Sequence, residues 1–250
     1  MESPLNPLAG PLAEALEENV RLKNELAKAA GSGEEALQHF VYAASHDLQE
    51  PLRMVLSYAQ LLQRQLPDDE RAREFTSFII SGVDRMSSLI QNLLAYSRVG
   101  TSKRRSTVQL DACLQWALLK LAPAIKESGA TVTSASLPEI EADETEMAQV
   151  FENLLSNALK FRHAAPPQIQ VSAEEGSGEW LLSVRDNGSG VDPRFLEQVL
   201  LPFKRLHGKQ IPGSGLGLAI CEKIVRAHRG RIWLESDGQQ GTTVHFTVAT

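Results

Sequence analysis

His46 stands out because the helix predicted around it turns this residue away from the apolar side. Over residues 41–53 and beyond, apolar residues recur at helical spacing. At about 100° per residue, position 46 lies about 200° from that apolar seam. An imidazole there points to solvent, beside Asp47 and with Glu50 one turn further along the same face. Because a buried structural histidine would lie on the seam, we predict that His46 is presented to a partner. The seam consists of Leu37, Val41, Ala44, Leu48, Val55 and Leu62.

A second group of chemically capable residues lies on a helix predicted from about residue 144 to 161. Asn153, Asn157 and Lys160 recur on one face at spacings of four and three, with Glu152 beside them. Amide oxygens can ligate Mg²⁺, and amide N–H groups and an ammonium can bind phosphate oxygens. The pattern therefore predicts a site for a metal-bridged polyphosphate, with a solvated helix face as the alternative.

A glycine-rich segment comes directly after the strand predicted over 179–185. It begins with Asp186 and contains Gly188 and Gly190. A carboxylate at a strand end can accept a hydrogen bond from the exocyclic amine of a purine, and glycines let the backbone approach a flat ring. A plain hairpin turn would use the same residue types, so this segment alone decides little.

A second glycine-rich segment, with Gly213, Gly215 and Gly217, precedes a helix predicted over about 216–228. Free N–H groups and the helix dipole make such a helix start an anion site. A Rossmann interpretation fails, because no parallel βαβ unit surrounds the motif. Residues 191–212, between the two glycine segments, are long enough to close over a nucleotide, with Phe203 as the expected apolar anchor.

The elements that position these residues fall into four parts. Residues 1–33 are predicted to be a disordered tail followed by a short charged helix or coiled coil. Residues 34–98 form an all-α hairpin of two long helices, with Pro51 kinking the first and a turn and N-cap at 67–69. One hairpin buries its seam poorly, so we expect a homodimeric four-helix bundle. A linker over 99–105 leads to an α+β sandwich over 106–250.

Within 106–250, strand and helix patterns alternate. Val108 and Leu110 predict a strand, and Asp111 is expected to cap a helix that ends at Gly129. Further strands are predicted over 130–135, 139–142, 168–173 and 179–185, and a closing hairpin places 232–234 beside 244–248. Together they predict one sheet against a helical layer.

Composition limits the remaining options. A net charge of −6 disfavours a nucleic-acid partner. Cys113 and Cys221 lack metal-ligand spacing and are expected to be buried thiols. No apolar run approaches the ~18 residues of a membrane span, and the N-terminus lacks a secretory pattern, so we expect a cytoplasmic protein without direct membrane insertion.

The order of these motifs resembles that of sensor histidine kinases, and the wording around 47–53 and 203–207 is most similar to the phytochrome-type subgroup. Ser45-His46-Asp47 with Pro51 resembles the phospho-acceptor box of that family. The run 152–161 resembles the asparagine box, and the two glycine segments with Phe203 between them resemble the glycine boxes and the intervening phenylalanine. The resemblance extends over about residues 34–250.

The resemblance implies ATP and Mg²⁺ as ligands and a histidine that receives the γ-phosphoryl group. His46 would be the nucleophile and Asp47 the base or orienting group. Asn153 would ligate Mg²⁺, Asn157 and Lys160 would hold phosphates, and Asp186 would hold adenine. The role of Glu152 stays open. A response-regulator aspartate would then receive the phosphoryl group, and a sensor module or another protein would act through the N-terminal helix.

One residue departs from the family pattern. Members that also dephosphorylate their regulator usually carry Thr or Asn four residues after the histidine, where this chain has Glu50. A carboxylate there repels an incoming phospho-aspartate, so we expect weak phosphatase activity. Two rival classes remain: a gyrase- or chaperone-type ATPase with the same nucleotide fold, and a non-enzymatic phosphotransfer or dimerisation adaptor.

Overall fold

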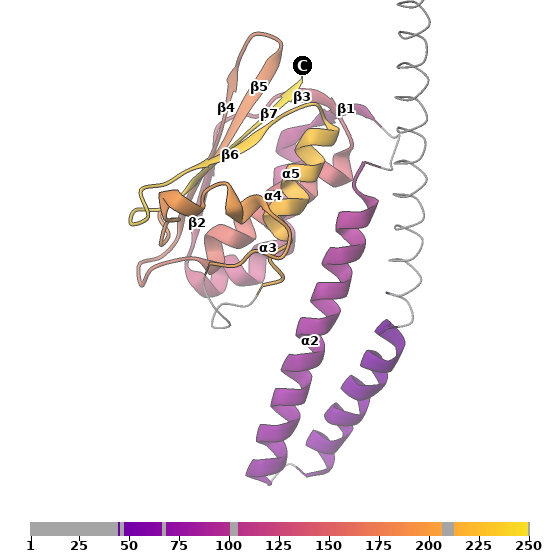
Figure 1. Cartoon of the computed structure of the whole chain (residues 1–250). Coiled ribbons are helices and arrows are strands. Elements are labelled where there is room, and N and C mark those ends of the chain that lie inside the picture. The colour runs from indigo at the N-terminus through magenta and orange to yellow at the C-terminus, as the bar shows by residue number, and fades with distance from the viewer. Residues whose placement is uncertain (1–44, 46–47, 67–68, 101–104, 207–212, 250) are drawn as a thin grey trace, which may run out of the picture.

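The computed structural model describes residues 45, 48–66, 69–100, 105–206 and 213–249 (Figure 1). A long helical hairpin leads into an α/β domain, and the end of the hairpin lies beside helix α5 of that domain. His46, Asp47 and the predicted N-terminal tail lie outside the described residues. Among the described residues, no helix is both long and apolar enough to cross a bilayer.

The hairpin consists of a helix over 48–65 and of α2 (Glu70–Arg98). Its predicted cap is confirmed: Asp69 is the N-cap of α2, and its Oδ1 accepts a hydrogen bond of 3.0 Å from the Ala72 N–H. Few of the described residues of the hairpin are buried in the single chain, and most of these are small or polar: Ser45, Ala59, Thr76 and Val83.

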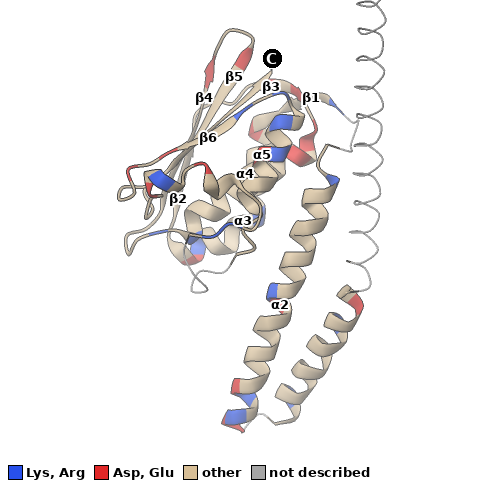
Figure 2. Ribbon diagram, viewed as in Figure 1, with Lys and Arg blue, Asp and Glu red and all other residues tan. Residues whose placement is uncertain are grey.

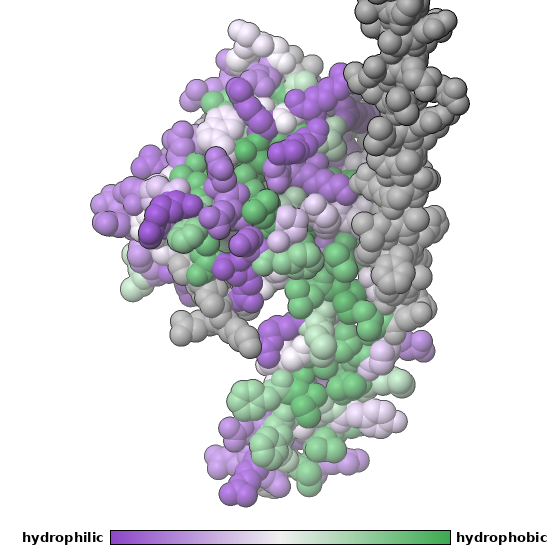
Figure 3. All heavy atoms as spheres, viewed as in Figure 1, coloured by the Kyte–Doolittle hydropathy of each residue, from purple (hydrophilic) through white to green (hydrophobic). Residues whose placement is uncertain are grey.

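Many large apolar residues of the hairpin are exposed in the single chain, as expected if one hairpin buries its seam poorly; Leu37, Val41 and Ala44 of that seam lie outside the described residues. Of the predicted seam residues, Leu48, Val55 and Leu62 are exposed in the single chain. On α2, Phe75 and Phe78 are exposed by 62% and 65%. Figure 3 shows hydrophobic surface along the hairpin, and in Figure 2 most of the hairpin is uncharged, with charged residues concentrated near the turn. Much apolar surface of the hairpin is therefore not covered by the described residues of one chain.

The α/β domain is built on a five-stranded sheet with the order β2-β4-β5-β7-β6. Its strands are β2 (Thr131–Ser134), β4 (Gln168–Glu175), β5 (Glu179–Asp186), β6 (Ile232–Glu235) and β7 (Thr243–Ala249). All neighbours are antiparallel except the parallel pair β2 and β4. The predicted closing hairpin is confirmed, with Leu234 opposite Val244.

One sheet face packs against the helices α3 (Leu110–Ser128), α4 (Glu144–Lys160) and α5 (Gly217–Ala227) (Figure 1). Phe151 of α4 and Phe246 of β7 meet edge to face in the core between them, with ring centroids 6.2 Å apart. Both predicted thiols, Cys113 and Cys221, are buried there. Burial raises the pKa of Cys113 to about 11 and that of Cys221 to about 12.

Three predictions at the start of this domain are wrong. Leu110 begins α3 instead of ending a strand, and its N–H, which has no partner inside the helix, bonds to the Pro138 carbonyl. Asp111 therefore lies inside the first turn, and its Oδ2 accepts from the Leu137 N–H instead of capping the helix. The single predicted sheet is also incomplete, since β1 (Ser106–Gln109) and β3 (Glu139–Ala142) form a separate two-stranded sheet. Gly129 ends α3 as predicted, with φ at 66°.

The segment between β5 and α5, predicted to be irregular, contains two short 3₁₀ turns at Pro193–Phe195 and Gln198–Leu200. The end of α2 is fastened to the core of the α/β domain. Val99 is buried in that core, and the Gly100 N–H donates to Glu146 Oε1 at 2.9 Å. The start of the predicted linker is thus packed, while residues 101–104 lie outside the described part.

Candidate functional site

Helix α4 presents the predicted amide face at its second half. Asp143 caps the helix by accepting from the Glu146 N–H at 3.1 Å, and apolar residues on the other side anchor it in the core. Asn153 and Asn157 are half-buried on the remaining face, and Lys160 is exposed at the helix end. The buried Asn153 Nδ2 has no hydrogen-bond partner at ordinary distance and angle among the described residues, although the Asn153 side chain lies near enough to the Cys221 thiol to oppose the rise in its pKa. A buried amide donor without a partner is costly unless a ligand supplies an acceptor.

Three charged residues, Lys120, Glu152 and Lys160, lie along this face with alternating sign. Lys120 of α3 holds Glu152 through an ion pair of 2.7 Å. Partial desolvation of its ammonium lowers the pKa of Lys160, and the negative charge of Glu152 acts in the opposite direction. Glu152 thus interacts with a cation on either side, and Lys160 lies at the end of the face where phosphates are expected.

Asp186 ends strand β5 and is held in place by the backbone. Its Oδ1 accepts from the N–H groups of Gly188 at 2.8 Å and of Thr242 at 3.2 Å. Burial raises the pKa of Asp186, while these two hydrogen bonds lower it. Oδ2 has no hydrogen-bond partner among the described residues. One carboxylate oxygen is therefore fixed and the other can accept from a ligand.

The glycines near Asp186 are needed for close contact between chain segments. A Cβ at Gly188 would lie 2.2 Å from the Phe161 carbonyl oxygen, and one at Gly190 would lie 2.9 Å from the Gln239 nitrogen. Gly190 also has a φ of 70°. The first contact joins the end of α4 to the loop after β5, and the second joins that loop to the turn between β6 and β7. We predicted glycine at these positions so that the backbone could approach a flat ring. The fold also requires glycine there, because the chain segments pack too closely for a side chain.

The second glycine segment contacts both α4 and the loop residue Phe203, which precedes the segment in the chain. A Cβ at Gly217 would lie 3.7 Å from Asn153 Oδ1, so the start of α5 lies next to the unpartnered amide. The Phe203 N–H donates to the Gly215 carbonyl at 2.9 Å, and Phe203 itself has a φ of 62° and is exposed. At Gly213, no atom of a described residue lies within 4 Å of the place a Cβ would take. The structure therefore brings Asn153, Phe203 and the second glycine segment together.

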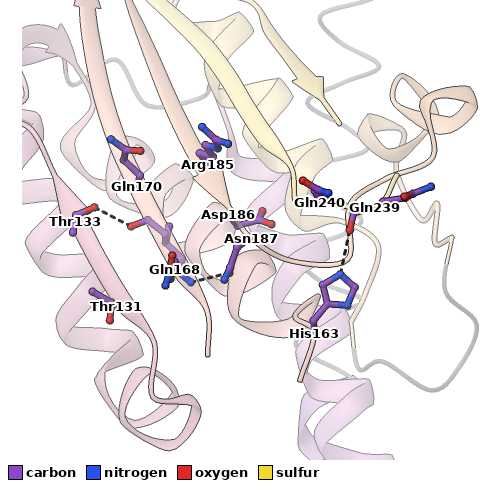
Figure 4. A pocket seen from close by; sticks show the side chains of 11 residues that line it. Thr131, Thr133, His163, Gln168, Gln170, Arg185, Asp186, Asn187, Gln239 and Gln240 are labelled. Atoms are coloured by element: carbon purple, nitrogen blue, oxygen red, sulfur yellow. Dashed lines mark hydrogen bonds between the residues drawn. The ribbon is translucent and has the colours of Figure 1, made fainter. Parts of the chain in front are cut away.

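A polar hollow of about 620 Å³ lies on the sheet face opposite the helices and shares only Asp186 with the predicted site residues (Figure 4). Exposed side chains of β2, β4 and β5 line it, including Thr133, Gln170 and Arg185. Asn187 Oδ1 accepts from the Gln168 N–H at 2.8 Å at its edge. The hollow is thus separate from the amide face of α4.

Several residues that support the site were not predicted. Thr242 donates to Asp186, and Gly241 allows this, because a Cβ at 241 would lie 2.0 Å from the Asp186 carbonyl oxygen. Ser236 Oγ accepts from the Val191 N–H at 2.9 Å and so holds the loop after Gly190. The Gly-Thr pair at 241–242 is the only signal in the sequence that could have indicated the first contact, and its partner lies 56 residues earlier.

Comparison with known families matches both parts of the chain. Residues 36–102 match the His Kinase A (phospho-acceptor) domain, and residues 142–250 match the histidine kinase-, DNA gyrase B-, and HSP90-like ATPase family. The chain is a sensor histidine kinase core. The phospho-acceptor domain distinguishes it from a gyrase- or chaperone-type ATPase. The observed hairpin and sandwich agree with the predicted fold class.

Individual relatives of this histidine kinase core are longer proteins. Cyanobacterial phytochrome A from Nostoc sp. is 44% identical over 92% of this chain and 31% of its own length. Phytochrome-like protein Cph1 from Synechocystis sp. is 39% identical over 92% of this chain and 32% of its own length. The crystal structure of full-length ShkA in complex with AMPPNP is similar at a TM-score of 0.67, with 27% identity, over 84% of this chain and 46% of ShkA. The chain thus spans about a third of the length of the two phytochrome relatives.

Proposed function

We propose that this core phosphorylates His46 from ATP and passes the phosphoryl group to an aspartate of a response regulator. The observation that carries the proposal is the pairing of the two domains in one chain, with Asp186, Asn153 and the glycine segments grouped around one face of α4. An adaptor with an inactive nucleotide domain has no need for these groups. Their presence therefore favours the kinase.

The residues at this face fit a nucleotide with a divalent cation. Asp186 Oδ2 would accept from the adenine amine, and Asn157 and Lys160 would bind phosphate oxygens. Asn153 Oδ1 would ligate Mg²⁺, and its buried Nδ2, which lacks a protein partner among the described residues, would donate to a phosphate oxygen. Bound Mg²⁺ would neutralise phosphate charge. The glycine segment at the start of α5 would add backbone N–H donors.

In the proposed reaction, an imidazole nitrogen of His46 attacks the γ-phosphorus of ATP. A P–N bond forms, the bond to the bridging oxygen breaks, and ADP leaves. Asp47 takes the proton that the imidazole ring releases. Phosphoryl transfer depends mostly on positioning and charge neutralisation, so the cradle around α4 matters more than the strength of the base. The regulator's aspartate then attacks the phosphorus and regenerates His46.

The partners follow from the same assignment. The exposed apolar face of the hairpin supports a homodimer in which two hairpins form a four-helix bundle. The histidine kinase ThkA, similar in fold at a TM-score of 0.58 and 20% identity, was crystallised with the response regulator protein TrrA. We expect a receiver domain of that kind as the acceptor. Input would reach the hairpin through the N-terminal helix.

The test is incubation with γ-labelled ATP and Mg²⁺, comparing the wild type with His46→Gln and with His39→Gln as a control in the same predicted helix. We expect acid-labile, base-stable label in the wild type and in His39→Gln, and none in His46→Gln. Equal labelling of all three proteins would refute His46 as the acceptor. A wild type that binds no nucleotide would favour the adaptor.

A further inference from the structure

Ser214, in the middle of the second glycine segment, is hydrogen-bonded to a residue of the helical hairpin. Asn92 of α2 donates from Nδ2 to Ser214 Oγ at 3.0 Å, across 122 residues of sequence. The same oxygen accepts from the Leu216 N–H at 3.2 Å. Two donors from different domains thus point at one hydroxyl oxygen.

This arrangement leaves the O–H of Ser214 as the one hydrogen-bonding group of the side chain without a protein partner among the described residues. A serine hydroxyl has one O–H donor and accepts through two lone pairs. Both acceptor positions of Ser214 are used, and the residue donates to no acceptor among the described residues. The O–H is therefore free of protein acceptors among the described residues and available to an incoming ligand oxygen. Leu216 is the N-cap of α5, so this donor lies at the positive end of that helix.

The neighbouring contacts hold Asn92 in place relative to Ser214. One turn further along α2, the Tyr96 carbonyl accepts from Lys223 Nζ of α5 at 3.1 Å. The same ammonium lies 4.9 Å from the centre of the Tyr96 ring. Because α2 is thus fixed against α5 beside the bond, Asn92 is oriented by the packing of two helices and not by an exposed rotamer alone.

We infer that Ser214 binds a phosphate oxygen of the nucleotide and that Asn92 is a positioning residue that directs its O–H toward that phosphate. Helix α2 of the phospho-acceptor hairpin then contributes to nucleotide binding in the other domain. The inference rests on the proposed function, because it requires a polyphosphate at the start of α5. It adds a residue of the hairpin whose effect on the nucleotide passes through Ser214.

The sharpest variant is Asn92→Asp, because it preserves shape and reverses the hydrogen bond. A carboxylate accepts only, so the Ser214 O–H would turn toward residue 92 and be lost to the phosphate. Gln91→Glu is the matched control, since exposed Gln91 is the next residue and receives the same charge. In equilibrium binding of ATP with Mg²⁺, we expect Asn92→Asp to raise Kd at least about tenfold relative to Gln91→Glu. Equal Kd values for the two variants would overturn the inference.

Ser214 variants test the pathway. Ser214→Ala should raise the ATP Kd about tenfold, whereas Ser214→Thr keeps the hydroxyl and should stay within about threefold of the wild type. In the Ser214→Ala background, Asn92→Asp should raise the ATP Kd no more than Gln91→Glu does. If Asn92→Asp still raised the ATP Kd about tenfold in the Ser214→Ala background, Asn92 would not act through Ser214, and the inference would be overturned.

Two controls separate this inference from other failures. If the wild type binds ATP and the variants match their controls, only the inference fails; if the wild type binds no ATP, the proposed function fails first. Melting temperature and light-scattering mass establish that each variant is folded and associates as the wild type does. Should Asn92→Asp not fold, the contrast between Ser214→Ala and Ser214→Thr still decides whether the hydroxyl binds phosphate.

Discussion

Gly188 packs so closely against the carbonyl oxygen of Phe161 that a Cβ at position 188 would lie 2.2 Å from that oxygen. The same carbonyl accepts the Ser189 N–H at 2.8 Å. The loop after β5 is therefore fastened directly to the end of α4, which carries Asn153 and Asn157. The spacing between the expected adenine-binding and phosphate-binding groups depends on this backbone contact.

Gly188→Ala should consequently lower both stability and nucleotide affinity. The added methyl group would meet backbone, which cannot rotate away, and overpacking of this kind costs about 1–3 kcal/mol. Urea denaturation of the wild type and the variant measures the loss. Gly213→Ala is the stability control, because no atom of a described residue lies within 4 Å of a Cβ at position 213. Equal unfolding free energies for the two variants would contradict the assigned role of Gly188.

Asp186→Asn should stabilise the fold while weakening nucleotide binding. The Asn oxygen can still accept from Gly188 and Thr242, whereas the buried charge disappears. Because burial places the folded-state pKa of Asp186 above its usual 3.8, its ionisation costs stability as pH rises between these two values. Below pH 3.8 the wild-type carboxyl is neutral in both states and the difference vanishes.

Unfolding free energies of both proteins at pH 7 and in acid measure this effect of Asp186→Asn. The variant should be the more stable at pH 7, and the two should converge in acid. Its ATP Kd at pH 7 should rise at least about tenfold, because an amide donor replaces the oxygen that would accept from adenine. Asp192→Asn, at an exposed carboxylate held by Arg194, serves as the control for nucleotide affinity. Unchanged affinity of Asp186→Asn would remove Asp186 from the site.

Phe78→Glu should separate the proposed dimer. Phe78 is exposed by 65% in one chain and belongs to the apolar face that a second hairpin would cover. A carboxylate buried there without a partner should raise the dimer Kd about 100-fold or more. Light scattering at micromolar concentration measures the mass, with Gln60→Glu, at an exposed polar position, as the control. A monomeric wild type would refute the dimer itself.

Glu50→Thr should increase dephosphorylation of the response regulator. Glu50 is exposed on the helix over 48–65, and its charge would repel a phospho-aspartate. A threonine hydroxyl at this position could orient a water, so we expect a rate increase of about tenfold or more. Loss of labelled phosphate from the regulator in the presence of ADP measures it. Rapid dephosphorylation by the wild type would contradict the inhibitory role of Glu50.

The sequence by itself determined the elements whose signal is local. Helix α4 was predictable because its apolar and amide faces repeat every three to four residues, and the N-cap at Asp69 was predictable because a cap bonds within its own first turn. The order of His46, the asparagines and the two glycine segments indicated the family. Each of these signals is contained within a short stretch of chain.

Tertiary structure alone decided the features that join distant residues. The Leu110 N–H bonds to the Pro138 carbonyl, 28 positions later in the chain, and β1 pairs with β3 in a separate sheet instead of joining the main one. The side of the hairpin that packs within one chain was likewise set by the second helix. The bond from Asn92 to Ser214 spans 122 residues, and no periodicity reports such a distance. Local patterns fix which residues share a face, but only packing decides what that face meets.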